Sequence, residues 1–297
     1  MLKNHDALGR PFPEAELPFE DCNVTDRAET WLTFLNVHRY ASSVYLHDLT
    51  LDTHASPDYT RRHLYALRKA RFIRYPAQQM ETADARSNFY VYELAPRGIE
   101  YLRDNGLYVD AVWPTGHWVH AYMTSCITAS IDIMARRNGF RYIPGHEITS
   151  RAQTTIGTKI GKSQLIPDQF FGLEYPDRTY RFFCVEADRG TEPTTAKNSR
   201  KTHRSTIRLY REFIGQKLYK DHYQLNAGLL LLAVFSRSSK LEAFNAELAK
   251  QSGGRNSYIL SQHIQGFDYR LKPPELLTYL FDKPYQRVGN DKFYINN

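Results

Sequence analysis

Residues 165–192 read LIPDQFFGLEYPDRTYRFFCVEADRGTE, and this stretch decides the fold of the second half of the chain. Two apolar runs flank the turn-forming residues Tyr175-Pro176-Asp177-Arg178, a pattern that predicts a β-hairpin. Asp168 then lies on the first strand, and Glu186 lies opposite it at the end of the second. Two facing carboxylates can bind a hard divalent cation, which can activate water and stabilise charge on a phosphodiester. A surface hairpin with scattered acids is the alternative.

Composition and charge indicate a folded protein with a polyanionic partner. The chain has 297 residues, 42% of them apolar and 24% charged, and its net charge is +7. Its three widely separated cysteines exclude a disulfide framework or a zinc ribbon. The N-terminus lacks the apolar region of a signal peptide, and the longest apolar run, 227–235, is too short to cross a bilayer. We therefore expect a cytoplasmic protein without a membrane segment.

The first third of the chain predicts a small helical domain at residues 25–111, after an N-terminal arm at 1–24. Thr25-Asp26 provides the cap of a first helix, and residues 42–46 predict a short second one. Ser56-Pro57 begins a third helix, with proline in its first turn. Residues 72–75 and 89–92 alternate like a two-stranded wing with a polar tip at 78–87, and a closing helix follows Pro96.

The third helix has an apolar back and a basic, aromatic front. Thr60, Leu64 and Leu67 share one stripe at 3.6 residues per turn. The predicted DNA-binding residues share the other side: Arg61, Arg62, Tyr65, Arg68 and Lys69. Such a helix can dock on its neighbours while its arginines reach phosphates and guanine edges in the major groove. The order of elements predicts a winged helix-turn-helix; a helical subdomain with a solvated basic face is the alternative.

Residues 112–297 predict an α/β domain with a mixed sheet. His117 and His120 open a long helix, where they could bind a metal or serve as core histidines. Residues 141–143 and 147–149 suggest a strand and its continuation, with Glu147 near the hairpin. Residues 153–163 suggest a polar loop. The apolar run 228–235 is typical of a strand buried on both faces.

A basic segment directly follows the acids of the hairpin. It is helical in character from Thr202 onward and contains few opposing acids. Either it is a solvated face, or it holds a nucleic-acid backbone beside a phosphodiester site. The candidate DNA-binding residues in and just before it are Arg189, Arg200, Lys201 and Arg204.

The order of these elements resembles the replication-relaxation family. The motifs that carry the resemblance are Leu94-Ala95-Pro96-Arg97-Gly98, His120, Pro167-Asp168 and Glu186-Ala187-Asp188-Arg189-Gly190-Thr191. That family is similar to MobC-type plasmid relaxases, which carry a PD-(D/E)xK nuclease-like core. The resemblance implies an α+β protein: a winged helix-turn-helix followed by a restriction-endonuclease-like domain with a mixed sheet.

The resemblance also implies roles for single residues. Asp168 and Glu186 match the two metal-binding acids of the nuclease core, with Mg²⁺ or Mn²⁺ as the implied cofactor. Asp188 stands where many such nucleases have lysine, so it is expected to bind the cation or lie just behind its ligands, with His120 nearby. The positive charge that stabilises the reaction is then expected from another basic residue: Lys197, Arg189 or Lys201.

The expected function is metal-dependent DNA nicking by a relaxase-like protein of a plasmid or integrative element. Its partners would be double-stranded DNA, a nicked or single strand, and other DNA-processing or transfer proteins. The missing lysine favours the alternative, a catalytically inactive DNA-binding replication or transfer accessory factor or regulator. A purely structural partner in a transfer complex is a third reading. The 21 tyrosines carry no nucleophile motif, so both hydrolysis and a covalent protein–DNA link stay open.

Overall fold

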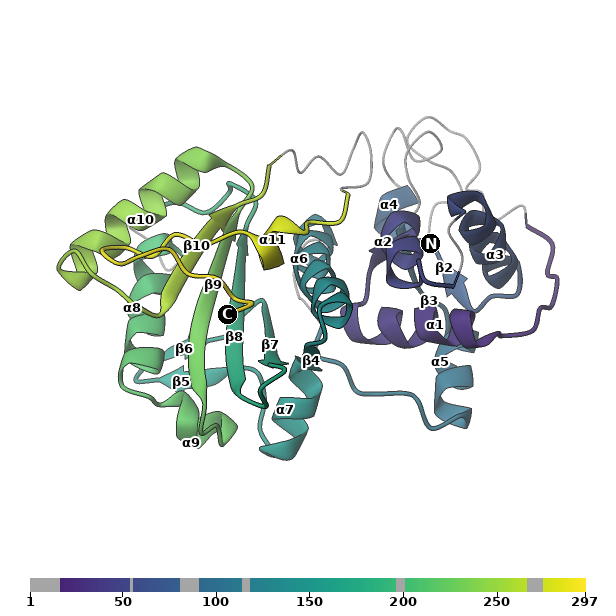
Figure 1. Ribbon diagram of the computed structural model, residues 1–297, viewed down its shortest axis with the longest axis horizontal. Helices are drawn as coiled ribbons and strands as arrows, with labels where there is room; N and C mark the ends of the chain where they lie inside the picture. The colour runs from purple at the N-terminus through teal and green to yellow at the C-terminus, as the bar shows by residue number, and fades with distance from the viewer. Residues whose placement is uncertain (1–16, 54–55, 81–90, 114–117, 196–200, 266–274) are drawn as a thin grey trace. The chain divides into compact units, whose positions relative to one another are not determined.

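The computed structural model describes residues 17–53, 56–80, 91–113, 118–195, 201–265 and 275–297. Helices and strands alternate along the chain, and the fold is mixed α and β (Figure 1). The chain forms two compact units. Unit 1 comprises Met1–Trp113 and Asp268–Leu276, and unit 2 comprises Pro114–Phe267 and Leu277–Asn297. No helix in the described ranges has both the length and the apolar character needed to span a membrane.

Unit 1 contains short helices and a small sheet. Its helices are α1 (Asp26–His38), α2 (Ser43–Leu49), α3 (Pro57–Lys69), α4 (Ala77–Met80) and α5 (Pro96–Asp104). Its strands are β1 (Ala41–Ser42), β2 (Ile73–Arg74) and β3 (Val91–Leu94), in the antiparallel order β1-β3-β2. The predicted helices and the antiparallel pairing of the predicted wing strands are confirmed. Residues 81–90, which include most of the predicted tip, lie outside the described residues.

Local sequence explains where the helices of unit 1 begin and which side they bury. The Thr25 hydroxyl accepts a hydrogen bond from the Ala28 N–H and caps α1. Helix α3 buries Thr60, Leu64 and Leu67 completely, as the helical periodicity predicts. Gly98, in the first turn of α5, is required sterically, because a Cβ there would clash with the Phe72 carbonyl oxygen.

Unit 2 is built on a five-stranded mixed sheet with the strand order β10-β9-β8-β7-β4. These strands are β4 (Arg141–Pro144), β7 (Gln169–Glu174), β8 (Tyr180–Asp188), β9 (Gly228–Phe235) and β10 (Ile259–His263). β8, β9 and β10 run parallel, whereas β7 pairs antiparallel with both β8 and β4. The predicted mixed sheet is therefore confirmed, and β7 and β8 form the predicted hairpin, whose turn is closed by Arg178 N–H donating to the Tyr175 carbonyl at 2.9 Å.

Helices cover both faces of this sheet (Figure 1). Helix α6 (Trp118–Arg137) packs on one face, and α8 (His203–Gly215) and α10 (Ser238–Ser252) pack on the other. The remaining elements are α7 (Gly145–Arg151), β5 (Thr158–Ile160), β6 (Ser163–Leu165), α9 (Tyr219–Tyr223) and α11 (Tyr279–Asp282).

Side chains alternate across the hairpin and fill both layers. Phe171 stacks on Tyr142 and Phe183, with ring centroids 5.1 and 5.0 Å apart. Its neighbour Phe170 points to the opposite face, where it stacks on Tyr223 at 4.3 Å. Because side chains alternate with a period of two, Glu186 shares the face of Phe170 and lies towards α8.

Two expectations for the segment before the hairpin are wrong. Glu147 lies on helix α7 and not on a strand, because Pro144 ends β4, lacks an N–H for the ladder and serves as the helix N-cap. Its carboxylate binds Arg141 at 2.6 Å. The predicted loop at 153–163 contains β5 and the start of β6, which form a small hairpin that buries Ile160 and Leu165. Three predicted site residues, His117, Lys197 and Arg200, lie outside the described residues.

Candidate active site

The β7–β8 hairpin brings the predicted acids together at one end of the sheet. Asp168 directly precedes β7, and its N–H donates to the Val185 carbonyl at 3.0 Å. Gln169 pairs with Val185, so the next step of the register places Asp168 opposite Glu186. A period of two puts Asp188 on the same face of β8 as Glu186. The hairpin register thus gathers three carboxylates that the sequence spreads over 21 residues.

Asp168 is anchored from two directions. Its Oδ2 accepts the Ala187 N–H at 2.8 Å, and its Oδ1 lies 3.1 Å from Nε2 of His120 on α6. Burial raises the pKa of Asp168, but the His120 hydrogen bond and the charge of Lys201 outweigh it, so the pKa lies below its ordinary value. Asp168 is therefore ionised, and His120 Nε2 carries the proton of this hydrogen bond. Burial lowers the pKa of His120, yet Asp168 raises it by more, so the net pKa is above the ordinary value.

Glu186 is held between a cation and a phenol. Its Oε2 lies 2.6 Å from Nζ of Lys201, and its Oε1 accepts the Tyr210 hydroxyl at 2.7 Å. Burial and the nearby Asp168 charge raise the pKa of Glu186, while Lys201 lowers it. The net effect raises the pKa from 4.5 to about 7. Near neutral pH, Glu186 can thus gain or lose a proton as its surroundings change.

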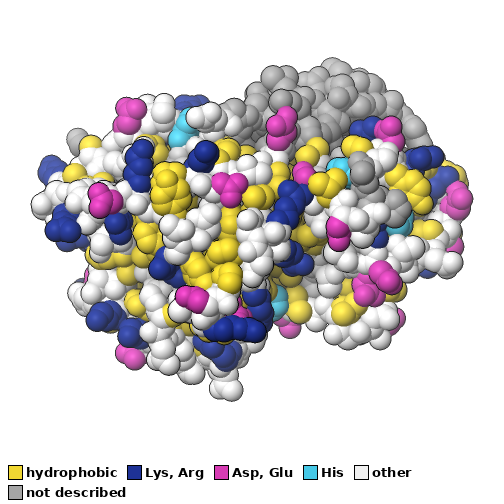
Figure 2. Space-filling view, viewed as in Figure 1, with side chains coloured by type: hydrophobic (Ala, Val, Ile, Leu, Met, Phe, Trp, Pro, Cys, Tyr) yellow, Lys and Arg dark blue, Asp and Glu magenta, His cyan; other side chains and the backbone are white. Residues whose placement is uncertain are grey.

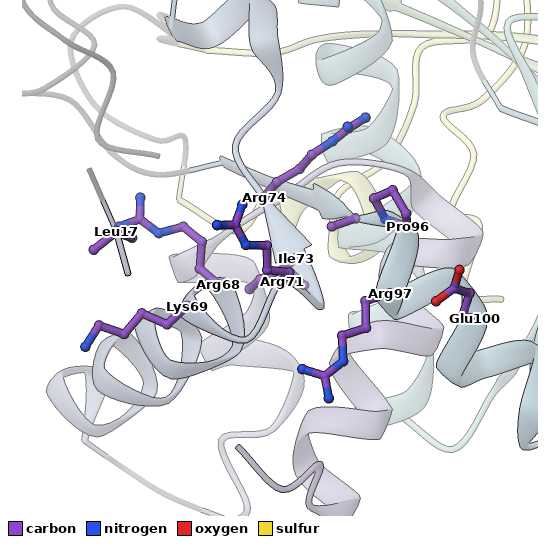
Figure 3. A pocket seen from close by; sticks show the side chains of 10 residues that line it. Leu17, Arg68, Lys69, Arg71, Ile73, Arg74, Pro96, Arg97 and Glu100 are labelled. Carbon is purple, nitrogen blue, oxygen red and sulfur yellow. The ribbon is translucent and has the colours of Figure 1, made fainter. Parts of the chain in front are cut away.

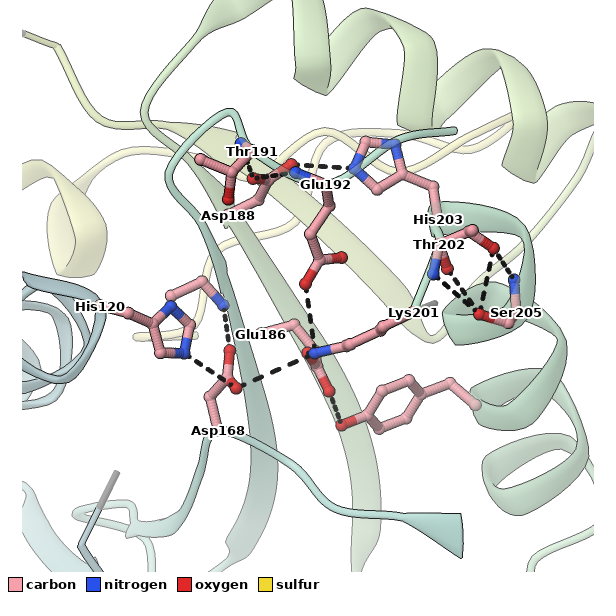
Figure 4. Close-up of polar contacts among 12 residues, drawn as sticks. His120, Asp168, Glu186, Asp188, Thr191, Glu192, Lys201, Thr202, His203 and Ser205 are labelled. Atoms are coloured by element: carbon pink, nitrogen blue, oxygen red, sulfur yellow. Dashed lines mark hydrogen bonds and ion pairs between the residues drawn. The ribbon is translucent and has the colours of Figure 1, made fainter. Parts of the chain in front are cut away.

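Lys201 lies at the centre of an acidic cluster formed by Asp168, Glu186 and Glu192 (Figure 4). Its Nζ lies 2.6 Å from Glu186 Oε2, 3.5 Å from Glu192 Oε1 and 3.9 Å from Asp168 Oδ1. Burial lowers the pKa of Lys201, but the three acids raise it well above its ordinary value. Since 43% of the side chain is exposed, a charged ammonium is available at the surface of the cluster.

The start of helix α8 fixes the position of Lys201. The Thr202 hydroxyl accepts the Ser205 N–H at 3.1 Å, and the Ser205 hydroxyl oxygen accepts the Thr202 N–H at 3.0 Å. This reciprocal capping box makes Thr202, the residue directly after Lys201, the N-cap of α8. The lysine is therefore presented from a defined helix end.

Asp188 organises the loop behind the cluster. Its Oδ1 accepts the N–H groups of Gly190, Thr191 and Glu192 at 2.7, 3.1 and 3.4 Å, and its Oδ2 accepts Nε2–H of the buried His203 at 2.9 Å. Burial raises the pKa of Asp188, but these donors outweigh it and lower the pKa. Gly190 has φ of 82°, and a Cβ there would clash with Arg237. The Asp-Arg-Gly-Thr motif is thus explained as a tight loop closed on the Asp188 carboxylate.

Glu186 makes stability depend on pH in a defined window. Its pKa is about 7 in the folded chain and 4.5 ordinarily, so between these values only the folded state holds the proton. Its contribution is full below pH 4.5 and is lost as pH rises through about 7. We expect the fall in unfolding temperature between about pH 5 and 7 to be smaller in Glu186→Gln than in wild type. Thermal unfolding across this range checks it, and parallel curves would contradict it.

The other predicted basic residues near the hairpin are less central. Arg189 is half-buried in the loop after β8, and Arg204 on α8 forms an ion pair with Glu247 at 2.9 Å. Over α8, α9 and α10, Figure 2 shows separate Lys and Arg side chains and no continuous basic patch. Three basic residues are candidates to supply the positive charge of the site: Lys197, Arg189 and Lys201. Among the described contacts, Lys201 is the one of these that reaches the carboxylates of the hairpin. Sequence reasoning did not single out Tyr210 or His203.

The predicted DNA-binding side chains on α3 divide into two groups. Arg61, Arg62 and Tyr65 are exposed; Arg61 forms an ion pair with Asp58, and Arg62 lies over the Tyr59 ring at 5.5 Å. Lys69 binds Glu20, as described below. Arg68 does not face outward as predicted: it is 8% exposed and lies over the Tyr75 ring at 4.2 Å.

The donor set of the acidic cluster suits a hard cation. Among the described residues, no group of three or more His, Cys, Asp and Glu side chains has the geometry of a metal site. Mg²⁺, however, commonly uses only one or two protein carboxylates and completes its octahedron with water and substrate phosphates. Asp168 and Glu186 already converge on one positive charge, the Lys201 ammonium. These two carboxylates therefore fit the kind of site that Mg²⁺ or Mn²⁺ takes beside a phosphate.

Comparison with known protein families gives one match. The model of a family described as replication-relaxation matches residues 32–229, about two thirds of the chain. The matched region includes α3, the hairpin, Lys201 and α8. No curated protein and no solved structure gives a significant match.

Proposed function

The chain belongs to the replication-relaxation family, and on this premise we propose that it nicks DNA with a divalent cation held at Asp168 and Glu186. The family implies interaction with DNA during replication or relaxation. The net charge of +7 favours the same partner. Under this proposal the protein acts on plasmid or integrative-element DNA as a relaxase-like enzyme.

The convergence of Lys201 on the acids is the observation that carries the proposal. The nucleases that the motifs resemble need two acidic residues, which bind the metal ion, and a positively charged side chain beside them. Position 188 holds aspartate, but Lys201 provides an ammonium 2.6 Å from Glu186 and 3.9 Å from Asp168. Under this proposal, a lysine supplied from the start of α8 takes the role of the one missing from β8, which supports catalysis despite the aspartate at 188.

Each residue of the cluster then has a distinct role. Asp168 and Glu186 would hold the cation, which would supply Lewis-acid activation of water and of the phosphodiester. Lys201 binds a non-bridging phosphate oxygen and stabilises the charge that develops on it. His120 orients Asp168 through the 3.1 Å hydrogen bond. Asp188 positions the loop through its hydrogen bonds to Gly190 and His203. It is given no ligand role in this proposal because, unlike Asp168 and Glu186, it makes no described contact with Lys201.

The proposal includes a fold for each unit, a winged helix-turn-helix for unit 1 and a nuclease-like core for unit 2. In unit 1, helices α1, α2 and α3 and the antiparallel strands β2 and β3 support a winged helix-turn-helix that finds duplex DNA. In unit 2, a mixed sheet with helices on both faces and acids on its central hairpin supports a PD-(D/E)xK-like core. A relationship to MobC-type relaxases would follow from that core.

One observation favours a second candidate, a DNA-binding accessory factor without catalysis. Lys201 and His120 already neutralise the two acids, and Tyr210 satisfies the remaining oxygen of Glu186. A buried network with all its partners can serve only to hold the fold. Under this reading the cluster joins α6, α8 and the hairpin and never binds a cation.

Metal removal separates the two candidates. We expect the full chain to nick supercoiled plasmid in the presence of Mg²⁺ or Mn²⁺ and to lose this activity when EDTA chelates the metal, whereas duplex binding persists. Gel analysis of plasmid forms and fluorescence anisotropy of a labelled duplex measure the two properties. Duplex binding without nicking at any metal concentration would favour the accessory factor. Denaturing gels of the nicked strand would distinguish a free end from a covalent protein–DNA link.

A further inference from the structure

Unit 1 contains a hollow of about 570 Å³ with a strongly basic wall. Five basic side chains line it, from the end of α3, the turn that follows, β2 and the start of α5: Arg68, Lys69, Arg71, Arg74 and Arg97 (Figure 3). Arg68 is buried over the Tyr75 ring, and Lys69 and Arg97 also lie over aromatic rings. Arg74 forms an ion pair with Glu93. The excess of positive charge around this basic hollow favours an anion there.

Carboxylates of the chain itself already occupy the edge of the hollow. Residues 17–22, here called the acidic segment, precede α1. Glu20 Oε2 lies 2.6 Å from Lys69 Nζ, and Asp21 Oδ1 lies 2.9 Å from Arg97 Nη2. Leu17 lines the hollow, and Phe19 lies 5.6 Å from the Arg97 guanidinium although the ring is 58% exposed. The segment is thus held mainly by two ion pairs at the surface, which are individually weak.

Arg71 stands at a position that favours glycine. It follows the C-cap of α3 with φ of 65°, a left-handed conformation that costs an L-residue energy and is usually given to glycine at helix ends. It forms no ion pair with any residue that the structure describes. A charged side chain kept in a strained backbone, with no ion-pair partner among the described residues and beside the hollow, is suited to bind an anion there.

We propose that the basic hollow binds backbone phosphates of DNA, and that the acidic segment covers it in the DNA-free protein. Glu20 and Asp21 hold Lys69 and Arg97 in place of phosphates and leave when DNA enters. Arg71 gains its partner only in the DNA complex. This inference rests on the proposed function in one respect, the identity of the polyanion as DNA.

Removing the negative charges of the acidic segment tests whether this segment covers the basic hollow. Anisotropy of a labelled duplex with the full chain should show about tenfold tighter binding for Glu20→Gln/Asp21→Asn than for wild type, a typical coupling between competing ligands. The matched control is Asp104→Asn/Asp110→Asn, which removes two exposed acids of the same unit. Affinity that stays within about twofold of wild type, or an equal gain in the control, would overturn the proposal.

Arg71→Gly tests the phosphate site without damaging the fold. Glycine takes the left-handed conformation freely, so the unfolding temperature should stay the same or rise. In the Glu20→Gln/Asp21→Asn background, duplex affinity should fall about fivefold, as for the loss of one phosphate contact. Undiminished affinity in a stable Arg71→Gly protein would refute the assignment.

A readout without DNA keeps the inference separate from the proposed function. Cys22 ends the acidic segment and is partly exposed, whereas Cys126 and Cys184 are buried. Inorganic tripolyphosphate should accelerate modification of Cys22 by a thiol reagent in wild type and less so in Arg71→Gly. Acceleration without duplex binding would refute the proposed function and retain the covered phosphate site. No acceleration would refute the inference even if duplex binds.

Discussion

Asp168→Asn is expected to nick plasmid about 10³-fold more slowly than wild type, a loss of about 4 kcal/mol of transition-state stabilisation. Asparagine keeps the size of the side chain and can still accept the Ala187 N–H. It lacks the negative charge that the cation needs and that holds the proton on His120. Initial rates of supercoiled-plasmid nicking at saturating Mn²⁺ measure the loss.

Glu174→Gln is the matched control for this variant. Glu174 lies at the other end of β7, is 6% exposed, and pairs with Arg178 at 2.7 Å and Arg141 at 3.4 Å. It is thus a second buried carboxylate of the same strand with basic partners. We expect its nicking rate to stay within about threefold of wild type. If Asp168→Asn retained the rate of this control, the site would lie elsewhere.

The sequence predicts the hairpin of the site well because its signal is local. Two apolar runs and a Pro-Asp turn need no distant contact to specify antiparallel pairing, and the pairing then sets Asp168 opposite Glu186. The expected roles of Asp168 and Glu186 stay predictions, since their geometry is compatible with either proposed function.

The position of the lysine could not be read from the sequence in the same way. Lys201 reaches Glu186 across 15 residues, and its place depends on where α8 starts and on which face of the sheet it packs. The local capping box at Thr202 sets the start of α8, but the face on which the helix packs follows from tertiary contacts such as the Asp188–His203 hydrogen bond. The sequence therefore offers several basic residues near the acids and no local rule for choosing among them.

The expected outward orientation of Arg68 is wrong for a reason that the sequence does contain, whereas its role in DNA binding stays a prediction. Arg68 lies four residues after Leu64, so it shares the buried side of α3 as well as the basic one. The Arg68 guanidinium lies over the Tyr75 ring at 4.2 Å from its centroid. The helical pattern alone does not reveal this contact. A long, partly apolar side chain at the border of two helix faces can belong to either.

Asp188→Ala is expected to destabilise unit 2 by about 3–5 kcal/mol, because it leaves buried hydrogen-bond donors without an acceptor. His203 is 2% exposed and lies edge-on to Phe235 and Phe244, where water cannot replace the lost carboxylate. The loop donors Gly190 and Thr191 lose their acceptor as well. Urea unfolding followed by far-UV circular dichroism measures the change.

Asp177→Ala is the control for this prediction. Asp177 also accepts hydrogen bonds from its own turn, the N–H and hydroxyl of Thr179 at 3.0 and 2.7 Å, but it is exposed to water. Its loss should change stability far less. Equal destabilisation by the two variants would show that Asp188 is an ordinary turn residue.

Asp188→Asn distinguishes a structural from a metal-binding role. An amide oxygen can still accept the loop N–H groups, so much of the stability lost in Asp188→Ala should return. If the carboxylate serves only the loop and His203, Mn²⁺ affinity measured by calorimetry should stay within about threefold of wild type, below the 10-fold minimum typical for residues that support metal ligands. A larger loss of Mn²⁺ affinity in a stably folded Asp188→Asn protein would give Asp188 a role at the metal, either as a third ligand or as a support of the ligands. As a third ligand, Asp188 would complete a three-carboxylate site beside Lys201, and its hydrogen bonds within the protein would have to open when the cation binds.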